Sequence, residues 1–158
     1  MLTRLRRFET IARKAQEFTA PQRSGAPPHP FDIRDIHPAL PPIVRDLFDD
    51  GHYAQATFEA FKYLDKCVQR HAASSESGFK LMMQAFDGSP PRIKLTRLSN
   101  KSETDEQEGF RFIFAGSDLA IRNPRAHEYG LKDDPDLCLD HLSLASMLLR
   151  RLEQSGYK

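Results

Sequence analysis

The chain of 158 residues has no tryptophan, few cysteines and almost no net charge. Its two cysteines, Cys67 and Cys138, are too few for a disulfide framework, so a reducing intracellular compartment is expected. The formal net charge is +1, so no overall field draws the chain to nucleic acid or membrane, and any polyanion site has to be local. No apolar run approaches the length of a membrane span, and the basic segment 1–14 lacks the apolar core of a secretory signal. These absences together predict a cytoplasmic protein with no membrane partner.

The rest of the composition fits one globular domain with an N-terminal extension. Hydrophobic residues make up 39% and charged residues 28% of the chain, and no internal repeat is present. Apolar residues spaced three and four apart predict an amphipathic helix over residues 2–18. Residues 21–30 contain several prolines and a glycine and predict a linker. We therefore expect residues 1–30 to form an N-terminal helix and Pro-rich linker, and residues 31–158 to form the main domain.

The main domain is helical in its periodicity and has no convincing pair of strands. The segment 92–103 is rich in Lys, Ser and Asn and alternates only loosely, so it is expected to be a loop. The fold class predicted is all-α, a bundle of four or five helices. The first expected helix has its entry at His37-Pro38 and Pro41-Pro42 and ends at Gly51. The others cover residues 52–73, 77 or 78 to 86, 104–121 and 135–154.

The densest group of chemically useful side chains is the motif Arg122-Asn123-Pro124-Arg125-Ala126-His127. Arginine carries a fixed positive charge and a planar fork of donors that suits phosphate oxygens. Histidine can give or take a proton near neutral pH. Arg122, Asn123 and His127 are therefore the candidate catalytic residues.

Two local structures would bring these polar groups together. In the first, Asn123 is an N-cap and Pro124 begins a new helix, so that His127 lies in a first turn, where free N–H groups attract phosphate and keep an imidazole neutral. In the second, one kinked helix continues through Pro124 and places Asn123 and His127 four residues apart on one face. The sequence leaves both open, and a plain helix start with solvated side chains is the simplest interpretation of the motif taken alone.

Four groups of residues follow one another in the order Leu47-Phe48-x-x-Gly51-His52-Tyr53-x-x-Ala56, Leu81-Met82, Gly109-Phe110-x-x-x-Phe114-x-Gly116 and Ile121-Arg122-Asn123-Pro124-x-Ala126-His127. With these groups the sequence, over about residues 36–153, is similar to the Ymh-type family of bacterial and phage proteins. That family in turn resembles the HEPN superfamily of helical ribonucleases and RNA-binding domains. The motif from Arg122 to His127 agrees with the HEPN pattern of an arginine, a polar residue and a histidine four to six positions on.

This resemblance implies a HEPN-like bundle and endoribonuclease activity that needs no metal or cofactor. Cleavage would proceed by attack of the RNA 2′-hydroxyl, at a site that two copies of the chain form together as a homodimer. A role in phage defence or as a toxin, with an antitoxin or regulatory partner, follows from the resemblance alone. Some HEPN domains are catalytically silent, so the alternative is a helical module that binds RNA or a partner protein without cleaving it.

Other candidate groups have simpler explanations. Cys67 with His71 and Cys138 with His141 have helical ligand spacing and together would form a Cys₂His₂ zinc site, although buried thiols and surface imidazoles explain them more simply. Glu59 and Lys62 are expected near the inward face of their helix, where the carboxylate could orient Arg122 or His127. A diffuse basic run could follow an RNA backbone or simply keep a loop solvated. Its members are Lys80, Arg92, Lys94, Arg97 and Lys101.

Overall fold

The computed structural model describes residues 27–128 and 130–157, and within them it is all-α, as predicted. The helix expected over 2–18 and most of the expected linker lie outside the described residues. Of the segment 92–103 expected as a loop, residues 92–100 form bends and irregular structure, and residues 101–103 belong to α6. An isolated bridge joins Gly88 to Pro91 just before this loop. The helical elements are α2 (Pro30–Ile33), α3 (Pro42–Asp49), α4 (Tyr53–His71), α5 (Gly78–Ala85), α6 (Lys101–Ser117), the π-helical η1 (Asp118–Arg122), α7 (Asn123–His127) and α8 (Pro135–Gln154).

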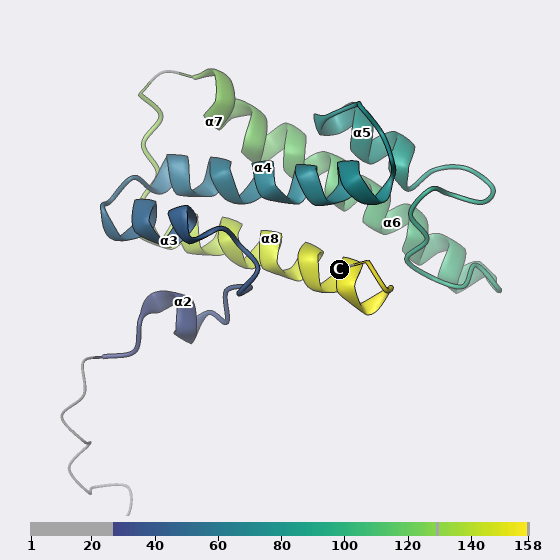
Figure 1. The fold of residues 1–158 in the computed structure, drawn as a ribbon, viewed down its shortest axis with the longest axis horizontal. Coiled ribbons are helices and arrows are strands. Elements are labelled where there is room, and N and C mark those ends of the chain that lie inside the picture. The colour runs from purple at the N-terminus through teal and green to yellow at the C-terminus, as the bar shows by residue number, and fades with distance from the viewer. Residues whose placement is uncertain (1–26, 129, 158) are drawn as a thin grey trace, which may run out of the picture.

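Helix α4 is the centre of the bundle. It lies between α8 and the long helical run from α6 to α7, and α3 and α5 pack near its two ends (Figure 1). An apolar stripe at helical spacing explains this position, because α4 buries Ala56, Ala60, Leu64 and Val68 along its length. The largest fully buried side chains are Phe61, Phe86, Phe114, Leu64, Leu81, Met82, Ile93, Leu142, Leu148, Leu152, Val44 and Val68.

Proline, acidic caps and glycine set the boundaries of several helices. Asp134 caps α8 by accepting the N–H of Leu137 at 2.8 Å, and Pro135 occupies the first turn. Gly51 follows α3 with a φ of +78°, a conformation that glycine adopts without a side-chain clash. The helix expected from Thr104 begins three residues earlier, at Lys101, because Asn100 is its N-cap and accepts the N–H of Glu103 at 3.0 Å.

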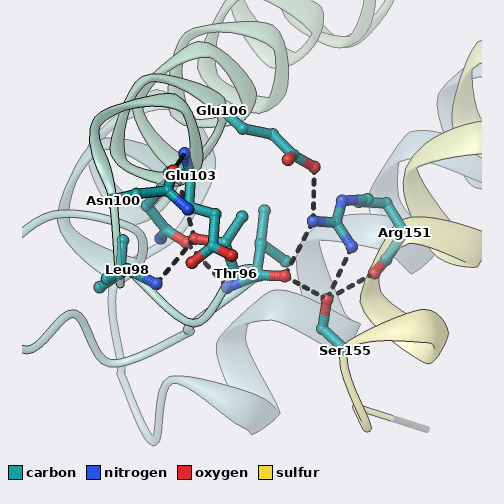
Figure 2. A network of polar contacts seen from close by, with 9 residues as sticks. Thr96, Leu98, Asn100, Glu103, Glu106, Arg151 and Ser155 are labelled. Carbon is teal, nitrogen blue, oxygen red and sulfur yellow. Dashed lines mark hydrogen bonds and ion pairs between the residues drawn. The ribbon is translucent and has the colours of Figure 1, made fainter.

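The loop before α6 is fixed to the bundle by a polar network (Figure 2). Arg151 donates to the carbonyl of Leu95 at 2.8 Å and to Glu106 at 2.7 Å, and so joins the loop, α6 and α8. Thr96 donates its hydroxyl to the carbonyl of Glu103 at 2.9 Å. The loop therefore supports one end of the long run that carries the motif at its other end.

Across the described residues, no helix is both long enough and apolar enough to cross a bilayer.

Candidate functional site

The candidate motif lies on a helical run that does not break at Pro124. Asn123 has helical torsions (φ −63°, ψ −43°), and its N–H bonds to the carbonyl of Asp118 five residues back. This wider π-turn absorbs the disturbance that proline causes, since Pro124 has no N–H to donate and its ring crowds the carbonyl four residues earlier. The expectation that Asn123 is an N-cap is therefore wrong, and the continuous helix is the correct alternative.

His127 is consequently the last residue of α7 and lies far from any first turn. The imidazole is exposed and makes no hydrogen bond with any residue that the structure describes. Asn123 lies one turn before it on the same face.

Arg122 is held on three sides. Its guanidinium stacks over the ring of Phe58 at 5.7 Å from the centroid, and Nη1 donates to Oδ1 of Asn123 at 3.1 Å. On the third side, Nε lies 3.9 Å from Oδ1 of Asp118, one turn back. The side chain keeps about a fifth of its surface, 22%, exposed. Arg122 and Asn123 are thus brought together, and part of the guanidinium remains open to solvent.

Behind Arg122 lie two buried carboxylates. Asp118 and Asp65 are each 2% exposed, and Asp65 accepts the N–H of Gly78 at 2.6 Å. Burial raises the pKa of Asp118; Arg122 opposes this rise, Asp65 adds to it, and the N–H of Phe79 opposes it. A Cβ at Gly78 would lie 3.1 Å from Oδ2 of Asp118, and the φ of +66° there also favours glycine. The start of α5 is therefore fitted closely against Asp65 and against Asp118, the carboxylate that adjoins Arg122.

Glu59, the carboxylate that the sequence suggested for orienting the motif, has no hydrogen bond to Arg122. It pairs with Lys62, at 3.1 and 3.2 Å. Sequence reasoning missed Asp118 and Asp65. Asp118 could have been found, because it lies four residues before Arg122 in an otherwise apolar stretch, which is the spacing of helical ion pairs.

The second arginine of the motif has a structural role. Arg125 forms a two-pronged ion pair with Asp133, from Nε at 2.7 Å and Nη2 at 2.8 Å, and its Nη1 donates to the carbonyl of Ile121 at 2.8 Å. The side chains are 7% and 3% exposed. This pair fixes the connection from α7 to α8. It leaves Arg122 as the arginine of the motif with an open side.

A second histidine lies close to this ion pair. Burial lowers the pKa of His141, and the charge of Arg125 lowers it further, while Asp133 and Asp140 act in the opposite direction. Its Nδ1 is buried and has no hydrogen-bond partner within the described residues. His141 is therefore set in the packing of α8, unlike the exposed His127.

The zinc alternative does not agree with the structure. Cys138 accepts a hydrogen bond from Thr57 at 3.5 Å, whereas Cys67 lies ten residues further along α4, roughly 15 Å away along the helix axis. Burial raises the pKa of both thiols, that of Cys138 to about 11, so neither is a ready thiolate ligand or nucleophile. Within residues 27–128 and 130–157, no group of three or more His, Cys, Asp or Glu side chains could hold a metal ion.

The basic run is interrupted by ion pairs. Lys80 pairs with Glu76 and Lys101 with Asp105, both at 2.8 Å, while Arg92, Lys94 and Arg97 are exposed on the loop before α6. The role of this loop in following RNA stays a prediction.

These features define a class of protein: an all-α bundle whose longest helical run ends in an arginine–polar–histidine motif. The family model described as "Protein of unknown function (Hypoth_ymh)" matches residues 34–152, so the chain belongs to that family. This confirms the Ymh part of the resemblance, and the wider HEPN relationship stays a prediction. Comparison with curated proteins and with solved structures gives no match.

Proposed function

We propose that this protein is an endoribonuclease of the HEPN type that cleaves RNA without a metal ion. The observation that supports this most directly is that the two arginines of the motif have different environments. Arg125 is fully engaged in an internal ion pair, while Arg122 is held beside Asn123 with part of its guanidinium open. A positioned arginine with an open side is suited to bind a phosphate.

The chemistry assigns a role to each residue of the motif. His127, exposed at the end of α7, exchanges protons with the attacking 2′-hydroxyl or the leaving 5′-oxygen. Arg122 binds the phosphate and stabilises the negative charge that develops on its oxygens. Asn123 holds Arg122 through its side-chain oxygen. The 2′-oxygen forms a bond to phosphorus as the bond to the 5′-oxygen breaks, which yields a 2′,3′-cyclic phosphate and a 5′-hydroxyl.

Because one motif supplies one histidine, we propose that a symmetric homodimer forms the complete site. The outward face of α6 and η1 supports this partner. Phe112, Ile113 and Leu119 are 55%, 42% and 54% exposed, which is unusual for large apolar side chains grouped on one helical run. A Cβ at Gly109 or Gly116 would meet no described atom within 4 Å, so the backbone is open there to close approach. This apolar face ends within one turn of Arg122.

The test is cleavage of a labelled single-stranded RNA in the presence of EDTA. We expect fragments that end in a 2′,3′-cyclic phosphate, and we expect His127→Ala to lower the rate by about two to four orders of magnitude. His52→Ala is the matched control, because His52 is also exposed but lies at the start of α4. Equal loss in both variants, or activity that EDTA abolishes, would contradict the proposal.

The same assay distinguishes the non-catalytic alternative. An exposed His127 with no hydrogen bond inside the described chain is also compatible with a binding surface. Binding of RNA by the wild type with no cleavage at any protein concentration would favour that module. Binding that Arg122→Lys weakens would then still identify the motif as the contact surface.

A further inference from the structure

The buried carboxylate of Asp118 lies between the start of α5 and the guanidinium of Arg122. Its Oδ2 and the Nε of Arg122 are both buried, and neither has a hydrogen-bond partner among the described residues. The Nε of Arg122 lies 3.9 Å from the other carboxylate oxygen, Oδ1. Buried polar atoms are normally paired, so an unpaired atom on each of two neighbouring side chains of opposite charge calls for an explanation.

The start of α5 has another acceptor within reach. The N–H of Gly78 is bonded to Asp65 at 2.6 Å, so a neutral residue at position 118 would leave that bond intact. The net effect of burial and of the charge on Asp65 is to raise the pKa of Asp118 even though Arg122 lies beside it. The charged form of Asp118 therefore costs stability, and the groups that favour it are the Arg122 guanidinium and, to a smaller extent, the N–H of Phe79 at the start of α5.

We propose that Asp118 is a positioning residue for Arg122, a role that rests on the proposed ribonuclease function. The carboxylate attracts the Nε edge of the guanidinium, while Phe58 supports its face and Asn123 holds Nη1. Fixed on these three sides, the guanidinium is pre-oriented before RNA binds, and the site avoids the entropy loss of ordering a long side chain on a phosphate.

The variant Asp118→Asn tests this role, because it removes the charge and keeps the size of the side chain. RNA cleavage should fall about 10- to 100-fold, the effect of a misplaced catalytic group, with the loss mainly in kcat. The midpoint of urea unfolding at neutral pH should stay the same or rise. Asp105→Asn is the matched control on the same helical run, since Asp105 is exposed and pairs with Lys101.

A double-mutant cycle shows whether Asp118 acts through Arg122. In an Arg122→Lys background, Asp118→Asn should cause little further loss of cleavage, because the guanidinium that it positions is gone. The proposal would be overturned if the two losses of cleavage rate were fully additive. It would also be overturned if the lower cleavage rate of Asp118→Asn were explained by a larger unfolded fraction of that variant.

A readout without activity separates this proposal from the ribonuclease function. The Arg122 Nε–H resonance in an NMR spectrum of ¹⁵N-labelled protein, assigned by its loss in Arg122→Lys, should exchange slowly with solvent in the wild type. It should exchange several-fold faster in Asp118→Asn and remain unchanged in Asp105→Asn. An unchanged signal in Asp118→Asn would refute the positioning role even if the protein cleaves RNA. A changed signal in a protein that cleaves no RNA would support the positioning and refute the ribonuclease.

Discussion

Arg125 and Asp133 face each other across the connection between α7 and α8 in a two-pronged ion pair that is almost fully buried. The pair lies directly after the turn that carries Arg122, so it fixes how the end of α7 meets the rest of the bundle. Arg125, which in the sequence could be a phosphate ligand, thus has a structural role and supports the turn that carries Arg122.

Removal of one partner from this pair should destabilise the protein strongly. Asp133→Ala leaves the guanidinium of Arg125 buried without a counter-charge, and we expect the free energy of unfolding to fall by about 3–5 kcal/mol. Urea denaturation measures this change. The control is Asp140→Ala, which breaks the exposed pair with Arg34 and should cost less than about 1 kcal/mol. Equal effects of the two variants would show that the buried pair is not the anchor described.

Replacement of the open arginine should impair catalysis and leave the fold intact. Arg122→Lys keeps the charge but cannot provide the planar fork, so the rate of RNA cleavage should fall by about two to three orders of magnitude. Arg92→Lys, on the exposed loop, should retain the wild-type rate within a few-fold. Both rates come from the same labelled RNA, with circular dichroism as the check on folding. Wild-type activity in Arg122→Lys would remove Arg122 from the site.

A charge on the apolar face of α6 should separate the proposed dimer. Phe112→Lys places an ammonium where the partner's apolar face is expected, so sedimentation should shift from dimer to monomer at tens of micromolar, and cleavage should fall with it. Ile33→Lys is the control, because Ile33 is 66% exposed on α2. A wild-type protein that sediments as a monomer throughout this range would contradict the composite site.

The stability of Asp118→Asn relative to the wild type should depend on pH. Burial, with the charge of Asp65, raises the pKa of Asp118 above its usual value of 3.8, although Arg122 and the Phe79 N–H oppose the rise. The folded protein therefore holds this proton more tightly than the unfolded chain, and the stability gained from it is lost as the pH rises through the folded pKa. Asn cannot ionise, so the variant should gain stability relative to the wild type as the pH rises from the usual value of 3.8 through the raised pKa of folded Asp118, and the difference should be constant above it. Urea unfolding across this range would contradict the expectation if the difference stayed constant or fell.

Both cysteines should react slowly in the folded protein. Each thiol is buried, and burial raises the pKa of Cys138 to about 11, so the thiolate that reacts with alkylating reagents is scarce at pH 8. Mass spectrometry after treatment with iodoacetamide should show little modification of the native protein and two adducts in urea. Rapid labelling of the native protein would indicate an open bundle.

The regular parts of the fold were predictable because their signals are local. Pro135 follows an aspartate and precedes a leucine-rich periodic stretch, so the expected helix over 135–154 agrees with α8 in the structure. The start of α6 was placed too late, because its N-cap Asn100 precedes a polar first turn that carries no apolar periodicity. The periodicity of apolar residues was enough to predict the all-α class. The residue at which each helix begins or ends depended on single capping residues.

The site was only partly predictable. The sequence indicated the motif, but it gave no means to distinguish Arg122 from Arg125, since the partner of Arg125 is eight residues away in a connecting segment. The π-turn was also out of reach, because a proline predicts a disturbance without specifying whether the helix breaks or widens. Asp65 is brought close to Asp118 by tertiary packing alone. Local rules find side chains that share a helix, and contacts between helices depend on the whole bundle.

The π-turn at Asp118–Arg122 also determines where two surfaces of one helical run point relative to each other. One residue turns an α-helix by about 100°, so the extra residue within this turn rotates α7 by a large angle about the axis of α6. Loss of a single residue between positions 118 and 121 would restore the α-helical register and rotate Asn123 and His127 about the helix axis, while Phe112 and Ile113 of α6 stayed in place. The number of residues in this short stretch therefore fixes the rotation of α7 relative to α6. An insertion or deletion of one residue there would change the alignment of the motif with the apolar face more than most side-chain replacements.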